Sequence, residues 1–169
     1  MEEVVGKQKK SALLEYVKVI VVTLVVTYIM LYFFQVSRVY GTSMLPTYHE
    51  GNIVIVEKVF YKNSEPTYND IVVVDYVNES SDETYIIKRV VGVGGDHLEI
   101  KDNQFYRNGK LVEEEYINET MQTDNMVVDV PEGKIFVLGD NRNVSLDSRI
   151  IGYVDFKKDV IGKVVLKLF

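Results

Sequence analysis

The chain has 169 residues, no cysteine and two histidines, and its net charge is −6. This length allows one domain with a small appendage, and the absence of cysteine excludes a disulfide framework, a thiolate zinc site and a cysteine nucleophile. With only His49 and His97 we expect no metal and no cofactor, and the acidic balance argues against a nucleic-acid partner.

The N-terminal region combines a polar segment with a long apolar one. Residues 1–18 contain four lysines and three glutamates, whereas residues 19–36 contain no charged side chain. The apolar run reaches the length needed to cross a bilayer if Leu13 and Leu14 join it and the Lys18 ammonium extends to the interface. We therefore predict a membrane anchor at residues 19–36. The preceding lysines place residues 1–18 in the cytoplasm and residues 37–169 outside the membrane.

Two alternatives compete with an anchor. A cleaved leader would have a shorter apolar core and an exit of the Ala-x-Ala kind, whereas the exit here is Val36-Ser37-Arg38-Val39-Tyr40. A buried helix of a soluble core would normally carry a polar face, and none is visible. Both alternatives fit the sequence less well than a span.

Beyond residue 36 the pattern becomes one of short β-runs. They are rich in Val and Ile, bounded by Gly, Asn, Asp or Pro, and lie at residues 52–58, 71–77, 85–93, 134–138 and 161–169. Turn residues at Asp102-Asn103 and Asn108-Gly109 predict a hairpin within residues 98–112. The polar stretch 118–129 is expected to be a loop. The fold class is thus mostly β after an N-terminal transmembrane helix.

Two residues suggest a catalytic pair. Ser43 lies in a turn-like segment, with Gly41 before it and Pro46 after it, and Lys88 lies within a run of strand-forming residues. A serine needs a neighbouring base to act as a nucleophile. A lysine becomes such a base when burial lowers its pKa, and strand alternation puts Lys88 on one face with Ile86 and Val90.

A third segment, residues 139–149, concentrates small, hydroxyl-bearing and charged residues after a predicted strand. One interpretation is an ion-paired turn that serves only the fold. The other is a set of groups that supports the catalytic pair, with a hydroxyl that holds the lysine amine and an Asp/Arg lattice that holds the hydroxyl.

Taken together, these segments resemble the bacterial type I signal peptidases, membrane-anchored Ser/Lys proteases that remove signal peptides from exported proteins. Besides the apolar span, the matching segments keep the family's order over nearly the whole chain: residues 41–47, 51–58, 69–74, 87–92, 95–96 and 139–152. The resemblance implies a β-rich catalytic domain with a small β appendage at about residues 96–130. It also implies signal peptides as substrates, contact with the lipid bilayer and proximity to the secretion translocon.

The resemblance also implies roles for particular residues. Ser43 matches the nucleophile, Lys88 the general base, and Ser145 the hydroxyl that hydrogen-bonds the lysine amine. The supporting lattice matches Asp140, Asp147 and Arg149, with Arg89 as a partner of Asp140. The pockets that accept small side chains one and three residues before the cut would be lined by Val39, Met44, Tyr48, Val54, Ile86 and Ile87.

One position departs from part of the family, in which a serine two residues before the nucleophile stabilises the oxyanion. That position is Gly41 here, so the Ser43 amide and another group must serve. Two rival readings remain. A self-cleaving repressor protease would carry a DNA-binding domain in place of the span, and a degenerate, signal-peptide-binding β domain would not need Ser43, Lys88 and Ser145 together.

Overall fold

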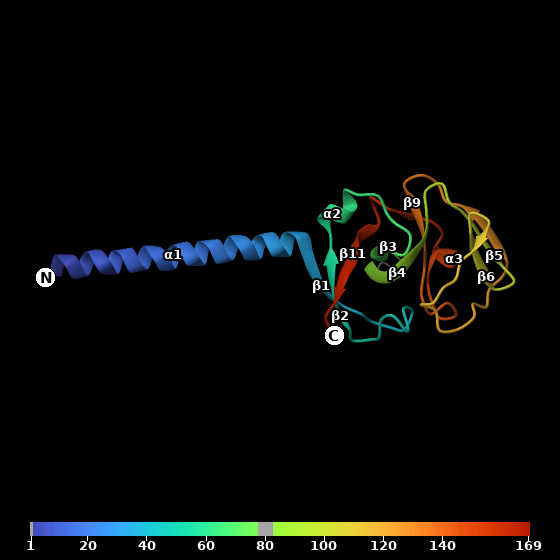
Figure 1. Ribbon diagram of the computed structural model, residues 1–169, viewed down its shortest axis with the longest axis horizontal. Coiled ribbons are helices and arrows are strands. Elements are labelled where there is room, and N and C mark those ends of the chain that lie inside the picture. Colours follow the sequence, from blue (N-terminus) through green and yellow to red (C-terminus); the bar gives the residue numbers. More distant parts are fainter. Residues whose placement is uncertain (1, 78–82) are drawn as a thin grey trace.

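The computed structural model describes residues 2–77 and 83–169, with side chains described within 13–76 and 85–169. Its first element is the long helix α1 (Glu2–Phe33), and the stretch Leu13–Phe33 has a mean hydropathy of 2.1 with none of it buried. The helix is thus long and apolar enough to cross a membrane. Figure 1 shows it projecting from the rest of the molecule as a single rod.

The end of this helix lies earlier than the sequence predicted. Residues 34–36, expected in the span, open the strand β1 (Phe34–Arg38), which pairs with β2 along its whole length. An apolar run does not distinguish helix from strand by itself, and here the pairing with β2 decides between them.

The described residues after β1 complete two antiparallel sheets and form two short helices. The larger sheet has the order β1-β2-β11-β3-β4-β9-β10, and the smaller has the order β7-β6-β5-β8. The larger sheet contains β2 (Ile53–Glu57), β3 (Ile71–Val77), β4 (Glu83–Val93), β9 (Lys134–Leu138), β10 (Val154–Asp155) and β11 (Val160–Lys167). The smaller contains β5 (His97–Lys101), β6 (Gln104–Arg107), β7 (Lys110–Leu111) and β8 (Met126–Asp129), and the helices are α2 (Val59–Lys62) and α3 (Ser148–Ile151).

The larger sheet has apolar side chains on both faces. Val72, Val74 and Val90 pack in one buried cluster, whereas the intervening Val73 packs with Ile87 in another. This alternation follows from the two-residue period of a strand. The mostly β class predicted from the sequence is confirmed, and the expected bounds of β3 and β9 match those observed.

The smaller sheet lies at the end of the domain far from α1 (Figure 1). Its hairpin matches the predicted turns, but the expected loop at residues 118–129 is wrong in its last part, because Met126–Asp129 forms β8 and pairs with β5. The stretch 118–129 is mostly polar, so its composition did not indicate this strand, whose exposed face carries Val127 and Asp129.

Candidate active site

Ser43 lies in the turn between β1 and β2. The turn begins at Gly41, whose φ of +79° is a left-handed conformation that glycine adopts without strain. Two hydrogen bonds from Asn141 hold the turn, since its amide donates to the Ser43 carbonyl (3.0 Å) and its Nδ2 to the Thr42 carbonyl (3.1 Å). Ser43 is therefore tied to the loop that follows β9.

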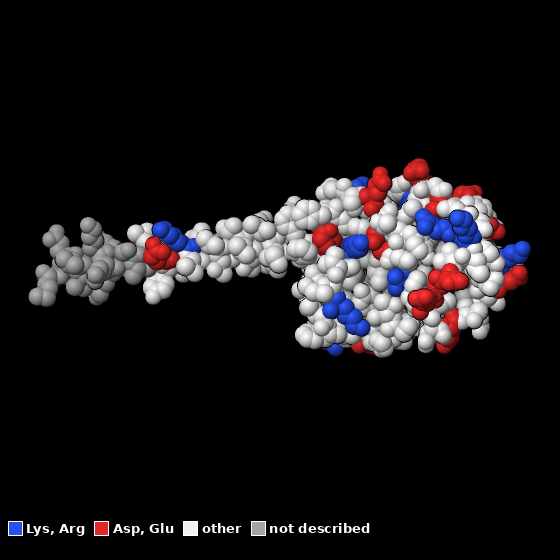
Figure 2. All heavy atoms as spheres, viewed as in Figure 1, with Lys and Arg blue, Asp and Glu red and all other residues white. Residues whose placement is uncertain are grey.

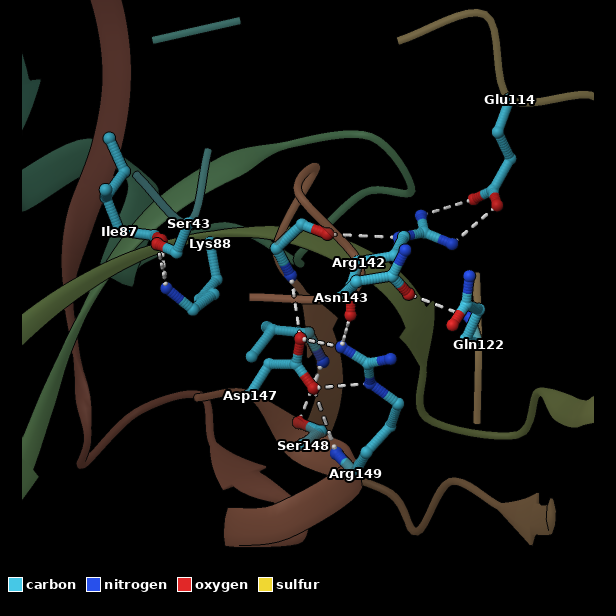
Figure 3. Close-up of polar contacts among 12 residues, drawn as sticks. Ser43, Ile87, Lys88, Glu114, Gln122, Arg142, Asn143, Asp147, Ser148 and Arg149 are labelled. Carbon is cyan, nitrogen blue, oxygen red and sulfur yellow. Dashed lines mark hydrogen bonds and ion pairs between the residues drawn. The ribbon is translucent and has the colours of Figure 1, made fainter. Parts of the chain in front are cut away.

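Lys88 reaches Ser43 from the middle of β4. Its Nζ donates to Ser43 Oγ at 2.8 Å and to the Ile87 carbonyl at 2.8 Å (Figure 3). The Lys88 side chain is 2% exposed. The two side chains that the sequence singled out, 45 residues apart, thus lie in direct contact.

Burial lowers the pKa of Lys88 from 10.5 to about 8, although the carboxylates of Asp147 and Asp140 act in the opposite direction. A buried ammonium loses its hydration, and the neutral amine gains relative to it. With a pKa of about 8, roughly a tenth of the Lys88 side chains are neutral at pH 7, several hundred times the fraction expected at 10.5.

The expected hydrogen bond from Lys88 to Ser145 is not present. Among the described residues, the buried Ser145 Oγ has no hydrogen-bond partner, because the Lys88 amine points to Ser43 and to the Ile87 carbonyl. Ser145 is nevertheless close, since a Cβ built on Gly139 would lie 2.2 Å from its hydroxyl and 2.5 Å from the Ser43 carbonyl. The loop after β9 thus packs directly against the nucleophile.

The Asp/Arg lattice consists of two buried ion pairs. Arg89 donates from Nε (2.8 Å) and NH2 (2.7 Å) to the Asp140 carboxylate, as the resemblance led us to expect. Asp147 accepts from Arg149 Nε (2.9 Å) and NH2 (2.8 Å), and also from the Gly139 amide (3.0 Å). Both carboxylates are almost fully buried, so each depends on its guanidinium for compensation.

Sequence reasoning missed a third pair in the same lattice. Arg142 makes a bidentate contact with Glu114, at 2.6 Å for each bond (Figure 3). It also donates from Nε to the Gly139 carbonyl (3.0 Å). The Tyr116 ring lies 3.9 Å beneath the Arg89 guanidinium. Arg142 lies inside the charged segment already identified, but no local spacing connects it to Glu114, 28 residues earlier.

A groove of about 650 Å³ opens beside the Ser43–Lys88 pair. Of the residues expected to line it, Val39, Val54, Ile86 and Ile87 do so, together with Val73 and Tyr85. Met44 and Tyr48 do not line it, because both are buried in the apolar cluster beneath β2. The groove continues along β1 past Arg38 and Ser37 to Gln35, which no motif indicated as a groove residue.

The backbone beside the groove leaves room for another strand. β4 pairs with β3 along residues 83–89, but its pairing with β9 begins only at Arg89. Among the described strands, one edge of residues 85–88 is therefore free next to Lys88. An extended peptide can add to such an edge through main-chain hydrogen bonds.

These features define a β domain whose buried amine contacts a serine hydroxyl beside an apolar groove. That combination can activate a nucleophile and hold an extended peptide. Across the described residues, no group of three His, Cys, Asp or Glu side chains is placed to hold a metal ion.

Comparison with known proteins identifies the family. The signal peptidase family, peptidase S26, matches residues 13–169. The chain is 38% identical to signal peptidase I of Bacillus licheniformis, over 96% of this chain and 91% of that protein. It is 34% identical to the probable signal peptidase I-1 of Synechocystis, over 92% and 82%. The chain belongs to the signal peptidase family.

A solved structure supports the same family assignment. The crystal structure of a signal peptidase I from Enterococcus faecalis is 30% identical and has a TM-score of 0.51, covering 60% of this chain and 98% of that one.

Proposed function

We propose that this chain is a membrane-anchored serine endopeptidase that removes N-terminal signal peptides from exported proteins. The observation that carries the proposal is the 2.8 Å contact between Ser43 Oγ and the buried Lys88 amine, whose pKa is lowered to about 8. The relatives named above support signal peptides as the substrate class. The helix α1 is the anchor, with its N-terminus in the cytoplasm and residues 34–169 on the far side of the membrane.

Neutral Lys88 acts first as a general base. It removes the Ser43 proton while Oγ attacks the scissile carbonyl carbon, which gives a tetrahedral oxyanion. No hydrogen bond occupies the Ser43 amide among the described residues, so this N–H is available to the oxyanion. A backbone donor at this point lowers the barrier by about 3–4 kcal/mol.

Lys88 then acts as a general acid. The ammonium gives its proton to the leaving nitrogen as the C–N bond breaks, and the acyl group stays on Ser43 as an ester. Neutral Lys88 next removes a proton from water, which attacks the ester carbonyl. The C–O bond to Ser43 breaks, and the proton returns to Oγ. One amine thus serves every proton transfer.

The supporting residues act through the pair. They hold the loop that packs on Ser43, and they are Ser145, Asp140, Asp147, Arg149 and Arg89. The substrate lies extended between the free edge of β4 and residues 38–41. Its side chains one and three residues before the cut face Val39, Val54, Ile86 and Ile87, where small residues fit the shallow apolar wall.

The test is cleavage of a preprotein with an Ala-x-Ala site by the purified full chain in detergent. We expect one cut after the second alanine. Ser43→Ala and Lys88→Ala should lose cleavage by a thousandfold or more, on the order of the loss when a nucleophile or its base is removed. The matched control is Lys110→Ala, a lysine on β7 that is exposed and far from the groove.

Two results would contradict the proposal. Cleavage that persists in both site variants would place the chemistry elsewhere. Binding of the signal peptide without cleavage by the wild-type chain would favour the degenerate, peptide-binding alternative.

A further inference from the structure

The boundary between α1 and β1 has no linker. The helix ends at Phe33 and the strand begins at Phe34, and β1 then pairs with β2 from Phe34↔Glu57 to Arg38↔Ile53. Figure 1 shows the ribbon turning from the helix straight into the strand. The last helical turn and the first strand residue therefore cannot move independently over more than a short distance.

Lys58 fastens the helix end to the domain. Its amide donates to the Phe33 carbonyl (3.0 Å), and its Nζ donates to the Leu31 carbonyl (3.3 Å). The last carbonyls of a helix lack partners within the helix and carry partial negative charge. Because α1 has no basic residue in its own last turn, Lys58 supplies both the cap and the positive charge from the domain.

Phe60 adds an aromatic contact to the same helix end. Its ring stacks on Phe33, with centroids 4.8 Å apart and an interplanar angle of 8°. The Glu57 carboxylate accepts from the amides of residues 59–61 at 2.7 Å each, which fixes the turn that presents Phe60. Phe60 is still 63% exposed, so it is not part of the domain core.

The strand that follows this junction is also a wall of the groove. Gln35 and Ser37 of β1 line the same cavity as Ser43 and Lys88. The helix end and β1 are thus joined to the domain by one continuous pairing with β2, which ends at Arg38, and the chain then turns to Ser43. Between Lys18 and the domain, the helix surface carries no Lys, Arg, Asp or Glu (Figure 2), so its outer end sits at a defined depth in a bilayer.

We propose that a junction clamp holds Ser43 at a fixed height above the outer end of α1. The clamp consists of Phe33, Lys58 and Phe60. The clamp thereby makes the enzyme select signal peptides by the length of their apolar core. This inference rests on the proposed function. A signal peptide core is itself a helix in the bilayer, and each added residue displaces the cut site by about 1.5 Å. A nucleophile held at a fixed height reaches the cut site of only a narrow range of core lengths. A nucleophile connected flexibly to the helix reaches the cut site of a wide range of core lengths.

The experiment uses the full chain in phosphatidylcholine/phosphatidylglycerol vesicles. Preproteins share one Ala-x-Ala site and carry leucine cores of about 10, 14 and 18 residues, which moves the cut site in steps of about 6 Å. Phe60→Ala and a Gly-Gly insertion between Phe33 and Phe34 release the clamp. Phe60→Trp preserves the stack, and Leu111→Ala is a control for loss of an exposed apolar side chain on β7.

We expect the wild-type chain to cleave its best core at least about tenfold faster than its worst. Phe60→Ala should reduce that ratio by about three- to tenfold, the range of an aromatic pair, and the insertion should reduce it further. Phe60→Trp and Leu111→Ala should keep the ratio. All variants should cleave a short soluble Ala-x-Ala peptide in detergent at the wild-type rate.

An unchanged core-length profile in both Phe60→Ala and the insertion variant would overturn the inference. Equal slowing of every substrate, including the soluble peptide, would also overturn it, because it would show a purely structural role for the clamp. Absence of cleavage by the wild-type chain would instead refute the proposed function, and the inference with it.

Discussion

Replacing Lys88 with methionine should abolish activity and yet stabilise the protein at neutral pH. Folding lowers the pKa of Lys88 from 10.5 to about 8 because the ammonium is desolvated. Below about pH 8 the side chain is protonated in both the folded and the unfolded chain, and the folded state then bears the full penalty of the buried charge. At about 1.4 kcal/mol per pH unit, the penalty is about 3 kcal/mol.

The penalty disappears as pH rises. Between about pH 8 and 10.5 the unfolded chain binds more protons at this site than the folded chain, so the contribution of Lys88 to stability increases with pH. Lys88→Met removes the charge but also the hydrogen bonds to Ser43 and Ile87, which together are worth about 1–3 kcal/mol. We expect a net gain of up to about 2 kcal/mol at pH 7 that vanishes or reverses near pH 10.5.

The assay is reversible denaturant unfolding of the full chain in detergent micelles, followed by far-UV circular dichroism at pH 7 and at about pH 10. The comparison is between wild type and Lys88→Met, with Lys110→Met as the control for an exposed lysine. The account of a desolvated ammonium would be refuted if Lys88→Met is less stable than wild type at pH 7 and if the difference in unfolding free energy does not change with pH.

Three further predictions follow from the site. The kcat/KM of the wild type should rise about tenfold per pH unit below the Lys88 pKa of about 8 and then level off, and a flat profile across that range would exclude this amine as the base. Gly139→Ala should lose about a hundredfold or more in kcat, because its Cβ would lie 2.2 Å from the Ser145 hydroxyl. Gly109→Ala meets nothing within 4 Å, so it should lose some stability through its φ of +74° but keep its activity. Arg142→Lys should lower the free energy of unfolding by about 1–3 kcal/mol through loss of its bidentate bond, measured as a shift in denaturant midpoint.

The sequence predicted best what local pattern controls. The β-branched runs at residues 71–77 and 134–138 are strands within the same bounds, because an apolar run between turn residues has few other ways to be buried. Ser43 and Lys88 were chosen from their residue types and neighbours, and the structure brings them to 2.8 Å. Those inferences needed no knowledge of which strands pair.

What the sequence could not predict depends on contacts between distant segments. Residues 34–36 continue the uncharged run of the helix before them, and only their pairing with β2 makes them a strand. Met126–Asp129 became a strand through pairing with β5. The resemblance implied that Met44 and Tyr48 line the groove, but both are buried in an apolar cluster of the domain.

The smaller sheet contributes to the site although none of its strands lines the groove. The chain that leaves β7 carries Glu114, whose carboxylate lies 2.6 Å from two nitrogens of Arg142. Arg142 in turn binds the Gly139 carbonyl, at the start of the loop that packs on Ser43. Removal of the Glu114 carboxylate would leave a buried guanidinium uncompensated, at a cost of about 3–5 kcal/mol. The loop that packs on Ser43 is therefore stabilised by the segment that leaves the smaller sheet, so damage to that segment should be felt at the Ser43–Lys88 pair.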